Sequence, residues 1–225
     1  MIFRDIIDFL IRSGDLVEFT KEVDPKFELT AIIEKVQKTS NKAVLFSNVK
    51  GYKNCRVASN ILGNYKRLAT VFNIESGEKE IISKLSERWG LIDTSSVSPA
   101  NTRKVFTKDF LLKELIPVIH HYEKDAGPYI TGGIVIAKDP ETSVQNLSYH
   151  RLQILDNNEL NLRITPGHHL GVYFDKAEKL GKPLEIAVLI GNSPSIMLAA
   201  STNLPFDWDE LKFAGSLQGS AIELI

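Results

Sequence analysis

The five histidines of the chain all fall between positions 120 and 169, and two short runs in that span hold side chains suited to chemistry. The first run is Asn146-Leu-Ser-Tyr-His-Arg151, and the second is Thr165-Pro-Gly-His-His169. Because imidazole is a common metal ligand and carries protons near neutral pH, these runs predict a metal or cofactor site. The alternative is that the paired histidines cap turns and face solvent.

The composition is that of an ordinary globular chain. At 225 residues, with 43% apolar and 24% charged residues, the chain suits one large domain or two small ones. A net charge of -1 provides no basic field, which argues against nucleic acid as a partner. The single cysteine, Cys55, excludes an internal disulfide and a multi-cysteine zinc site, and it predicts a cytoplasmic protein. No apolar run approaches membrane-spanning length and no signal-peptide pattern opens the chain, so no integral membrane segment is expected.

Periodicity predicts alternating helices and strands in the first part of the chain. Apolar residues at helical spacing from Phe3 to Leu10 predict a first helix that Gly14 ends. Asp24-Pro25 predicts the start of a second helix, with aspartate as the cap and proline at the first helical position. Strands are expected at 16–23, 43–49 and 56–60, and further helices at about 65–72 and 78–88. This order predicts an α/β layer domain over residues 1–105.

The remainder of the chain is predicted to be rich in strands. A polar stretch from Thr94 to Thr107, which contains Pro99, is the expected boundary between two domains. Strands are predicted at 130–137, 145–155, 160–165 and 184–190. Helices are predicted at about 170–180, after Ser193-Pro194, and from about 207 to 213, the last closed by Gly215. The second domain is therefore expected to cover residues 106–225 and to be β-rich.

Six separated motifs occur in an order that carries a family resemblance. They are Glu22-Val-Asp24, Leu45-Phe-Ser-Asn-Val-Lys-Gly-Tyr52, Asp125-Ala-Gly-Pro-Tyr-Ile-Thr131, Lys138-Asp-Pro-Glu-Thr142, Asn146-Leu-Ser-Tyr-His-Arg151 and Asp209-Glu-Leu-Lys-Phe-Ala-Gly215. The series resembles the UbiD family of reversible (de)carboxylases, which use prenylated FMN, and it spans essentially the whole chain. The resemblance implies an α+β fold in which residues 106–225 form a cofactor-binding split β-barrel, similar to that of flavin reductases.

Two departures from the family pattern bear on function. The family motif reads Asp-Pro-Glu-Thr-Gly, whereas Ser143 stands in the glycine place here, where a turn with positive φ would strain a serine. Family members are also considerably longer, and by the resemblance their remaining barrel strands, catalytic acid and C-terminal domain would lie beyond Ile225. The chain is therefore expected to be the N-terminal half of such an enzyme, and the barrel is expected to be incomplete. The resemblance further implies a flavin prenyltransferase that supplies the cofactor, a separately encoded C-terminal subunit as a candidate partner, and an oligomeric state.

The resemblance assigns a metal site to three residues. Asn146 offers an amide oxygen, His169 an imidazole and Glu210 a carboxylate, and these match the positions at which the family holds its metal. Such a ligand set suits Mn²⁺ or Mg²⁺, which would bridge the flavin phosphate to the protein, and the resemblance allows K⁺ as a further ion. His168 is the alternative imidazole ligand. The plain alternatives are a turn-capping amide at Asn146 and a solvated carboxylate in the first turn of a helix at Glu210.

Arg151 is the catalytic residue that the resemblance indicates. A guanidinium binds a carboxylate through two parallel hydrogen bonds, so it would hold the substrate acid beside the cofactor, which is the electron sink. The alternative is a surface cation at a strand end. Strict alternation would put Asn146 and Arg151 on opposite faces of one strand, which predicts a bulge or a cofactor that wraps the strand end. Besides Arg151 and the metal-site residues, the expected cofactor contacts are Ser148, Tyr149, His150, Arg163 and His168, with Thr131 in a further matching segment.

The sequence thus predicts one component of a prenylated-FMN-dependent (de)carboxylase, a lyase that acts on an aromatic or α,β-unsaturated carboxylic acid. This component carries the cofactor and metal site but lacks the catalytic acid, so the isolated chain is expected to be inactive. The alternative is a non-catalytic flavin- or metal-binding accessory subunit of a split decarboxylase. A third interpretation is a chain that has the fold and binds no cofactor.

Overall fold

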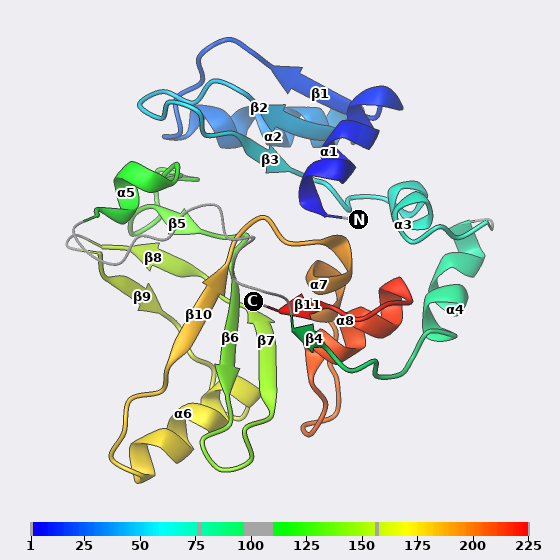
Figure 1. The fold of residues 1–225 in the computed structure, drawn as a ribbon. Helices are drawn as coiled ribbons and strands as arrows, with labels where there is room; N and C mark the ends of the chain where they lie inside the picture. The colour runs from blue at the N-terminus through cyan, green and yellow to red at the C-terminus, as the bar shows by residue number, and fades with distance from the viewer. Residues whose placement is uncertain (1, 76–77, 97–109, 156–157, 225) are drawn as a thin grey trace. The chain divides into compact units, whose positions relative to one another are not determined.

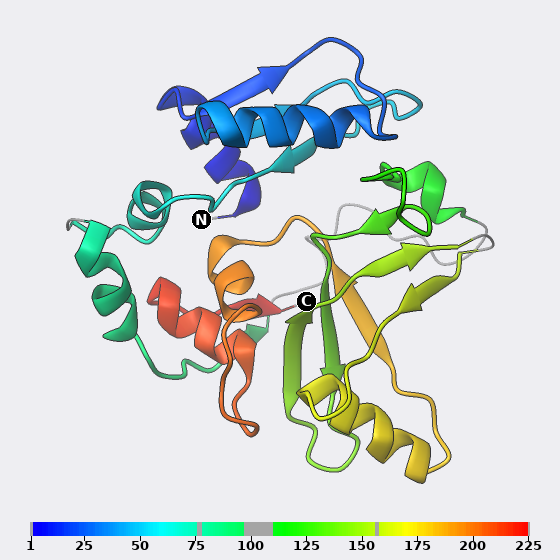
Figure 2. The same ribbon diagram turned by 180° about the vertical axis from the view of Figure 1, so that it is seen from behind.

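The computed structural model describes residues 2–75, 78–96, 110–155 and 158–224. The chain divides into two compact units that interleave along the sequence (Figures 1 and 2). Unit 1 consists of Met1–Glu78, Phe106–Ile130 and Leu152–Asn161, and unit 2 of Lys79–Val105, Thr131–Arg151 and Leu162–Ile225.

Unit 1 contains a three-stranded sheet between two helices. The strands lie in the order β1 (Leu16–Phe19), β2 (Ala43–Phe46) and β3 (Val57–Ser59), with β1 and β2 parallel and β3 antiparallel to β2. All four residues of β2 are buried, and because side chains alternate along a strand they feed two separate core clusters. Helix α1 (Phe3–Arg12) supplies the cluster on one face, and α2 (Glu28–Thr39) packs on the other (Figures 1 and 2).

The second helix does not begin where Asp24-Pro25 predicted. Helix α2 begins at Glu28, after Phe27 with its positive φ of 69°. The Phe27 N–H donates to the His120 carbonyl at 2.9 Å, and the His120 N–H donates to the Pro25 carbonyl at 3.2 Å. The left-handed φ of Phe27 interrupts the helical backbone, and the Pro25 carbonyl already accepts from His120, so the regular helix begins only at Glu28.

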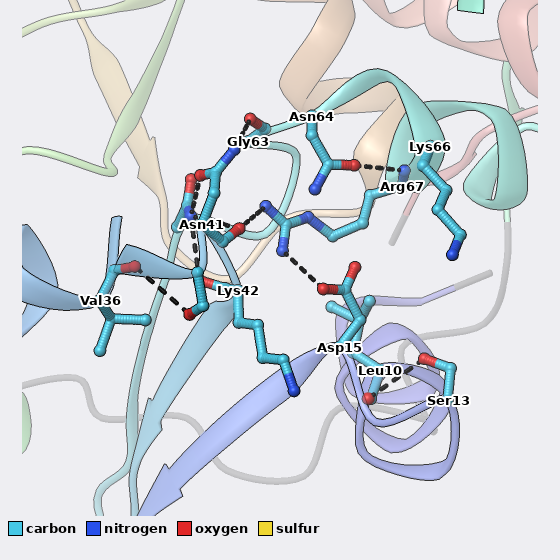
Figure 3. Close-up of polar contacts among 12 residues, drawn as sticks. Leu10, Ser13, Asp15, Val36, Asn41, Lys42, Gly63, Asn64, Lys66 and Arg67 are labelled. Carbon is cyan, nitrogen blue, oxygen red and sulfur yellow. Dashed lines mark hydrogen bonds and ion pairs between the residues drawn. The ribbon is translucent and has the colours of Figure 1, made fainter. Parts of the chain in front are cut away.

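Arg67 ties the turns of unit 1 together and is buried despite its charge (Figure 3). It lies on α3 (Tyr65–Val71), whose N-cap is Asn64. Its Nη2 donates to the Asn41 carbonyl at 2.7 Å, and its Nη1 lies 3.5 Å from the Asp15 carboxylate. Burial lowers the pKa of Arg67, while Asp15 opposes that shift. The guanidinium therefore connects the segment after α1 to the segment after α2.

Two predicted long strands are each broken into two. The segment 130–137 divides into β5 (Tyr129–Ile130) and β6 (Ile134–Lys138), and the segment 145–155 divides into β7 (Gln145–Tyr149) and β8 (Leu152–Ile154). Strands β5 and β8 pair with β9 (Leu160–Leu162) in one sheet, whereas β6 and β7 belong to another. The breaks fall at Gly132-Gly133 and at His150-Arg151, where the chain changes sheets.

Unit 2 is built on the antiparallel sheet β10-β6-β7, in which β10 spans Ile186–Leu189. Helix α6 (His169–Lys179) contacts β6 and β7, and α8 (Glu210–Gln218) contacts β7 and α7 (Pro194–Ala199). The remaining described elements of the chain are η1 (Glu78–Glu80), α4 (Ile81–Ser86), β4 (Ser95–Ser96), α5 (Leu112–Leu115) and β11 (Glu223–Leu224), of which β4 and β11 pair in parallel.

Gly215 does not close the last helix. Helix α8 continues to Gln218 and ends at Gly219, which has the left-handed φ of 76° typical of a helix C-terminus. Gly215 is buried inside the helix, where an added Cβ would lie 3.2 Å from the Ser220 carbonyl oxygen and 3.3 Å from that of Ile92. This glycine therefore permits close packing.

The mixed α+β class is confirmed. In the described parts of the chain the strands form four small sheets without a closed barrel, so the split-barrel layout stays a prediction. The division into domains at residue 105 also stays a prediction, since the polar boundary Thr94–Thr107 lies mostly in 97–109, outside the described residues. None of the described helices has both the length and the apolar character needed to cross a membrane.

Candidate cofactor and metal site

Asn146, His169 and Glu210 meet in unit 2, although 64 residues separate the first from the last. The Asn146 Nδ2 donates to Glu210 Oε1 at 2.8 Å and lies 3.2 Å from His169 Nδ1. The His169 Nδ1 and Glu210 Oε1 are 3.8 Å apart. The predicted convergence of these three side chains is therefore confirmed, while their role as metal ligands stays a prediction.

Three secondary-structure elements position these side chains. Asn146 is the second residue of β7, where it pairs with Ala137 of β6. His169 and Glu210 are the first residues of α6 and α8, preceded by the N-cap residues His168 and Asp209. The positive end of a helix dipole lies at each of these two N-termini, which favours bound or developing negative charge there.

Burial sets the electrostatics of Glu210, which is 2% exposed. Burial raises the pKa of Glu210 to about 7. Hydrogen-bond donors act in the opposite direction and lower the pKa, among them the Leu147 backbone N–H, which donates to Oε2 at 2.9 Å, and the Asn146 amide. Burial likewise lowers the pKa of His169, with a smaller contribution from His168. Both shifts favour the neutral form, because removal from water penalises the charged form of a carboxyl and of an imidazole alike.

The three side chains line a pocket of about 570 Å³. This volume lies within the range of about 300–1,000 Å³ found for small-molecule sites. The pocket is also lined by Leu147, Ser148, Tyr149, His150, Thr165, Gly167, His168, Leu170, Ala200, Ser201, Thr202, Asn203 and Leu204. Of the expected cofactor contacts, the structure thus brings Ser148, Tyr149, His150 and His168 together with the three convergent residues.

A hydrogen-bond chain leads away from Asn146 along the pocket wall. The Ser148 hydroxyl donates to Asn146 Oδ1 at 3.2 Å and lies 2.9 Å from His150 Nε2. On the other side of the ring, His150 Nδ1 lies 3.4 Å from the Arg163 carbonyl oxygen. Burial lowers the pKa of His150, which favours the neutral ring. This series of contacts connects the strand that carries Asn146 to the segment that carries Arg163.

Arg151, Arg163 and Thr131 are not among the residues that line this pocket. All three are exposed. Arg151 lies in the break between β7 and β8, so neither a bulge nor one continuous strand relates it to Asn146. The break resolves the expected conflict of strand faces, because the chain leaves the sheet before Arg151.

Aromatic residues behind His169 were not predicted from the sequence. The Phe206 ring meets the His169 ring edge-on at 4.9 Å and the Tyr173 ring at 5.8 Å between centroids. Tyr173 is fully buried, and its hydroxyl has no hydrogen-bond partner among the described residues. Burial raises the pKa of Tyr173 to about 12. Its spacing of four residues from His169 places the two on one helix face, a signal that the sequence did offer.

The donor set fits a hard divalent cation. No group of three or more His, Cys, Asp or Glu side chains in the described ranges is placed to hold a metal, so a metal here depends on the Asn146 amide oxygen. An amide oxygen, a carboxylate and one imidazole suit Mn²⁺ or Mg²⁺. Separations of 2.8–3.8 Å between the polar atoms are short enough for the three side chains to share one ion, once Asn146 presents its oxygen in place of the Nδ2 that faces Glu210.

Two models of one carboxy-lyase family match the chain. The model of the UbiD 3-octaprenyl-4-hydroxybenzoate carboxy-lyase Rift-related domain matches residues 94–225. The model of the N-terminal domain of the same family matches residues 7–89. The chain belongs to the UbiD family.

Individual relatives agree with this assignment. The chain is 35% identical over 224 residues to anhydromevalonate phosphate decarboxylase of Methanosarcina mazei, covering all of this chain and 50% of the relative. It is 27% identical to phenolic acid decarboxylase of Bacillus subtilis, of which it also covers 50%. The chain therefore spans about half the length of the curated relatives it matches.

Solved structures show the same likeness. An evolved dimeric form of the UbiD-class enzyme HmfF from Pelotomaculum thermopropionicum, in complex with prFMN, matches 99% of this chain with a TM-score of 0.91 and 33% identity. Vanillic acid decarboxylase of Sedimentibacter hydroxybenzoicus in its closed form matches with a TM-score of 0.93 and 28% identity. The chain covers 52% and 49% of these two structures. Both solved chains are thus about twice as long as this one.

Proposed function

We propose that residues 1–225 form the cofactor- and metal-binding part of a prenylated-FMN-dependent (de)carboxylase that acts on an aromatic or α,β-unsaturated carboxylic acid. The convergence of Asn146, His169 and Glu210 on a pocket of about 570 Å³ is the observation that carries this proposal. Membership of the UbiD family and the prFMN bound by a structural relative support it.

Each residue of the site has a role in this proposal. Asn146, His169 and Glu210 would hold Mn²⁺ or Mg²⁺ against the flavin phosphate, with K⁺ as a further candidate ion. Ser148, Tyr149, His150 and His168 would border the flavin, because they line the same pocket. The prenylated flavin supplies the electron sink for decarboxylation when it is bound. Arg151 would hold the substrate carboxylate, and Arg163 would contact the cofactor from outside the pocket lining.

The proposal extends to the protein's surroundings. The acid that handles the proton would come from residues outside 1–225, either further along one chain or in a separate C-terminal subunit. The second domain would then be completed as a split β-barrel. The cofactor would come from a flavin prenyltransferase, and the protein would be an oligomer. The single cysteine supports a location in the cytoplasm.

Binding of flavin and metal by the purified chain tests the proposal. Mn²⁺ binding can be followed by electron paramagnetic resonance, and binding of prenylated FMN by its absorbance. We expect Glu210→Gln to weaken Mn²⁺ binding by at least about tenfold. Loss of a residue that only supports a metal ligand already lowers metal affinity by about that factor, and loss of a ligand should lower it at least as much. Glu178→Gln, at an exposed carboxylate of α6, should bind as the unchanged chain does. Equal Mn²⁺ affinity in all three proteins would overturn the metal site.

A non-catalytic accessory subunit is the second candidate. The exposure of Arg151, and its position outside the pocket lining, favours it. In that case the chain would deliver or store the flavin, and Arg151→Ala would leave the activity of the complete assembly unchanged. In the catalytic proposal the same substitution would abolish it.

A further inference from the structure

The orientation of the Asn146 amide is incompatible with metal binding as it stands. Its Nδ2 faces the other two residues of the site, 2.8 Å from Glu210 Oε1 and 3.2 Å from His169 Nδ1. Its Oδ1 points the other way and accepts a hydrogen bond from the Ser148 hydroxyl at 3.2 Å. An amide NH₂ group has no lone pair to offer, so a cation bound here must meet the oxygen.

Metal binding therefore requires the Asn146 amide to turn over by about 180°, which exchanges the positions of its oxygen and nitrogen. After that rotation Oδ1 faces Glu210 and His169, and Nδ2 faces Ser148. Asn146 is 4% exposed, so water cannot easily satisfy the NH₂ group in its new position. The Ser148 oxygen is the acceptor that the structure provides.

The hydrogen bonds of Ser148 and His150 must then reverse. A hydroxyl has one proton, so while Ser148 donates to Asn146 it can only accept from His150 Nε2, 2.9 Å away. A neutral His150 with its proton on Nε2 presents a bare Nδ1 to the Arg163 carbonyl oxygen at 3.4 Å, and two acceptors face each other. Once Ser148 accepts from Asn146, its hydroxyl can donate a hydrogen bond to His150 Nε2. The His150 ring can then carry its proton on Nδ1 and donate to the Arg163 carbonyl oxygen. Every group then has a partner.

We propose that Ser148 and His150 are positioning residues that select the metal-binding orientation of the Asn146 amide through this hydrogen-bond chain. The inference rests on the proposed function, because it concerns the metal of that same site. Ser148 and His150 touch no reacting atom in this role. They act on the metal by stabilising one of the two orientations of a ligand, and the His150 proton moves from Nε2 to Nδ1 as the metal binds.

Binding of Mn²⁺ alone to the full 225-residue chain tests the first part. We expect Ser148→Ala to weaken Mn²⁺ binding about tenfold, because the turned amide then has a buried N–H without a partner. Ser148→Thr keeps a hydroxyl and should stay within about twofold of the unchanged chain. His150→Leu should weaken binding, and His150→Gln, which can accept a hydrogen bond, should restore it. Ser201→Ala is the matched control: Ser201 lines the same pocket, but its hydroxyl donates to the Met197 and Leu198 carbonyls of α7 and not to Asn146 or His150.

The position of the proton on the His150 ring tests whether the hydrogen bonds reverse when the metal binds. This position would not change if Ser148 and His150 only stabilised the fold. In chain labelled with ¹⁵N-histidine, diamagnetic Mg²⁺ should convert the His150 ring to the form protonated on Nδ1, and Ser148→Ala should abolish that conversion. His150→Gln assigns the signal. If the unchanged chain and Ser148→Ala bind the metal with equal affinity, the proposed role of the hydrogen-bond network is wrong. It is also wrong if the unchanged chain binds the metal and the His150 ring does not change. Either result leaves the proposed function standing. Failure of the unchanged chain to bind either ion would overturn both.

Discussion

At the residue scale, burial decides the ionisation of Glu210. The side chain accepts hydrogen bonds from Asn146 and Leu147, yet these do not offset the loss of water, and its pKa rises to about 7. A bound divalent cation would reverse this shift, because it stabilises the ionised carboxylate. Below about pH 7 the chain therefore holds a proton on Glu210, and a divalent cation bound there would displace it.

The raised pKa of Glu210 predicts a pH dependence of stability. Between the ordinary value of 4.5 and about 7, the folded metal-free chain keeps this proton while the unfolded chain loses it. The stability that this side chain contributes is thus present below pH 4.5 and is lost as the pH rises to about 7, a change of about 3 kcal/mol. Urea unfolding with a chelator present, at several pH values, should show this decline. Glu210→Gln should remove it and Glu178→Gln should not, and parallel curves for all three proteins would contradict the prediction.

Ser143 carries local strain that glycine would relieve. Its φ is 64°, a left-handed conformation that costs a residue with a Cβ about 1 kcal/mol or more. The Ser143 N–H nevertheless donates to the Asp139 carbonyl at 2.9 Å, so the turn is held in this form. We expect Ser143→Gly to raise the free energy of unfolding by about 0.5–1 kcal/mol in urea denaturation. Ser40→Gly, at a φ of -123°, should lower it, and a lower stability for Ser143→Gly would show that the turn does not need a glycine.

Motif context, and not spacing, made the site predictable. Asn146, His169 and Glu210 come from a strand and two helix starts, and no local period relates such positions. The turn at Ser143 could be predicted, because the family motif places a glycine there. The amide orientation of Asn146 could not, since it depends on Ser148 and on two residues that lie far away in the sequence.

At the scale of elements, an ion pair between Lys176 and the buried Asp139 carboxylate connects α6 to the turn between β6 and β7. Lys176 Nζ lies 2.7 Å from the Asp139 carboxylate and 2.9 Å from that of Glu141. Burial raises the pKa of Asp139, but Lys176 and the backbone N–H groups of Glu141 and Thr142 outweigh it, so the pKa lies below its ordinary value. Lys176 is on the same helix as His169, and the pair therefore helps to hold the start of α6 against the sheet.

Loss of Lys176 should cost more than loss of an exposed lysine. Lys176→Met leaves the Asp139 carboxylate, which is 1% exposed, without its cation, and we expect a loss of about 1–3 kcal/mol in unfolding free energy. Lys84→Met removes the pair with Glu87, in which both side chains are at least 50% exposed, and should change stability by less than about 1 kcal/mol. Equal effects in urea denaturation would show that the buried pair does not anchor α6.

The predicted elements succeeded where periodicity was strong and failed where distant contacts decided. Helices α1 and α6 lie close to the predicted ranges, because an apolar stripe and a closing glycine are local signals. The helix start at Asp24-Pro25 failed because the backbone is left-handed at Phe27, next to the pairing of the Pro25 carbonyl with His120. Nothing local marks Arg67 as buried, since its partners Asn41 and Asp15 belong to other turns.

At the scale of the whole molecule, the chain belongs to the UbiD family but spans about half the length of its curated relatives. Models of two family domains match residues 7–89 and 94–225, and the chain covers about half of the decarboxylases that it resembles. The one carboxyl group that lines the pocket, among the described residues, is Glu210, which the Asn146 and Leu147 donors engage. Replacing CO₂ by a proton needs a positioned acid as well as an electron sink.

We therefore expect no turnover from the 225-residue chain supplied with prenylated FMN and Mn²⁺. The measurement is CO₂ release, or deuterium exchange into the product acid, with a panel of aromatic and α,β-unsaturated acids. A full-length relative in the same buffer serves as the positive control, and flavin absorbance verifies that the chain is loaded. Loss of the catalytic acid should cost several orders of magnitude in rate, because residues that act as a unit in catalysis lose most of their effect together. Turnover comparable to that of the control would place a catalytic acid within residues 1–225, and Glu210 would be the first residue to examine.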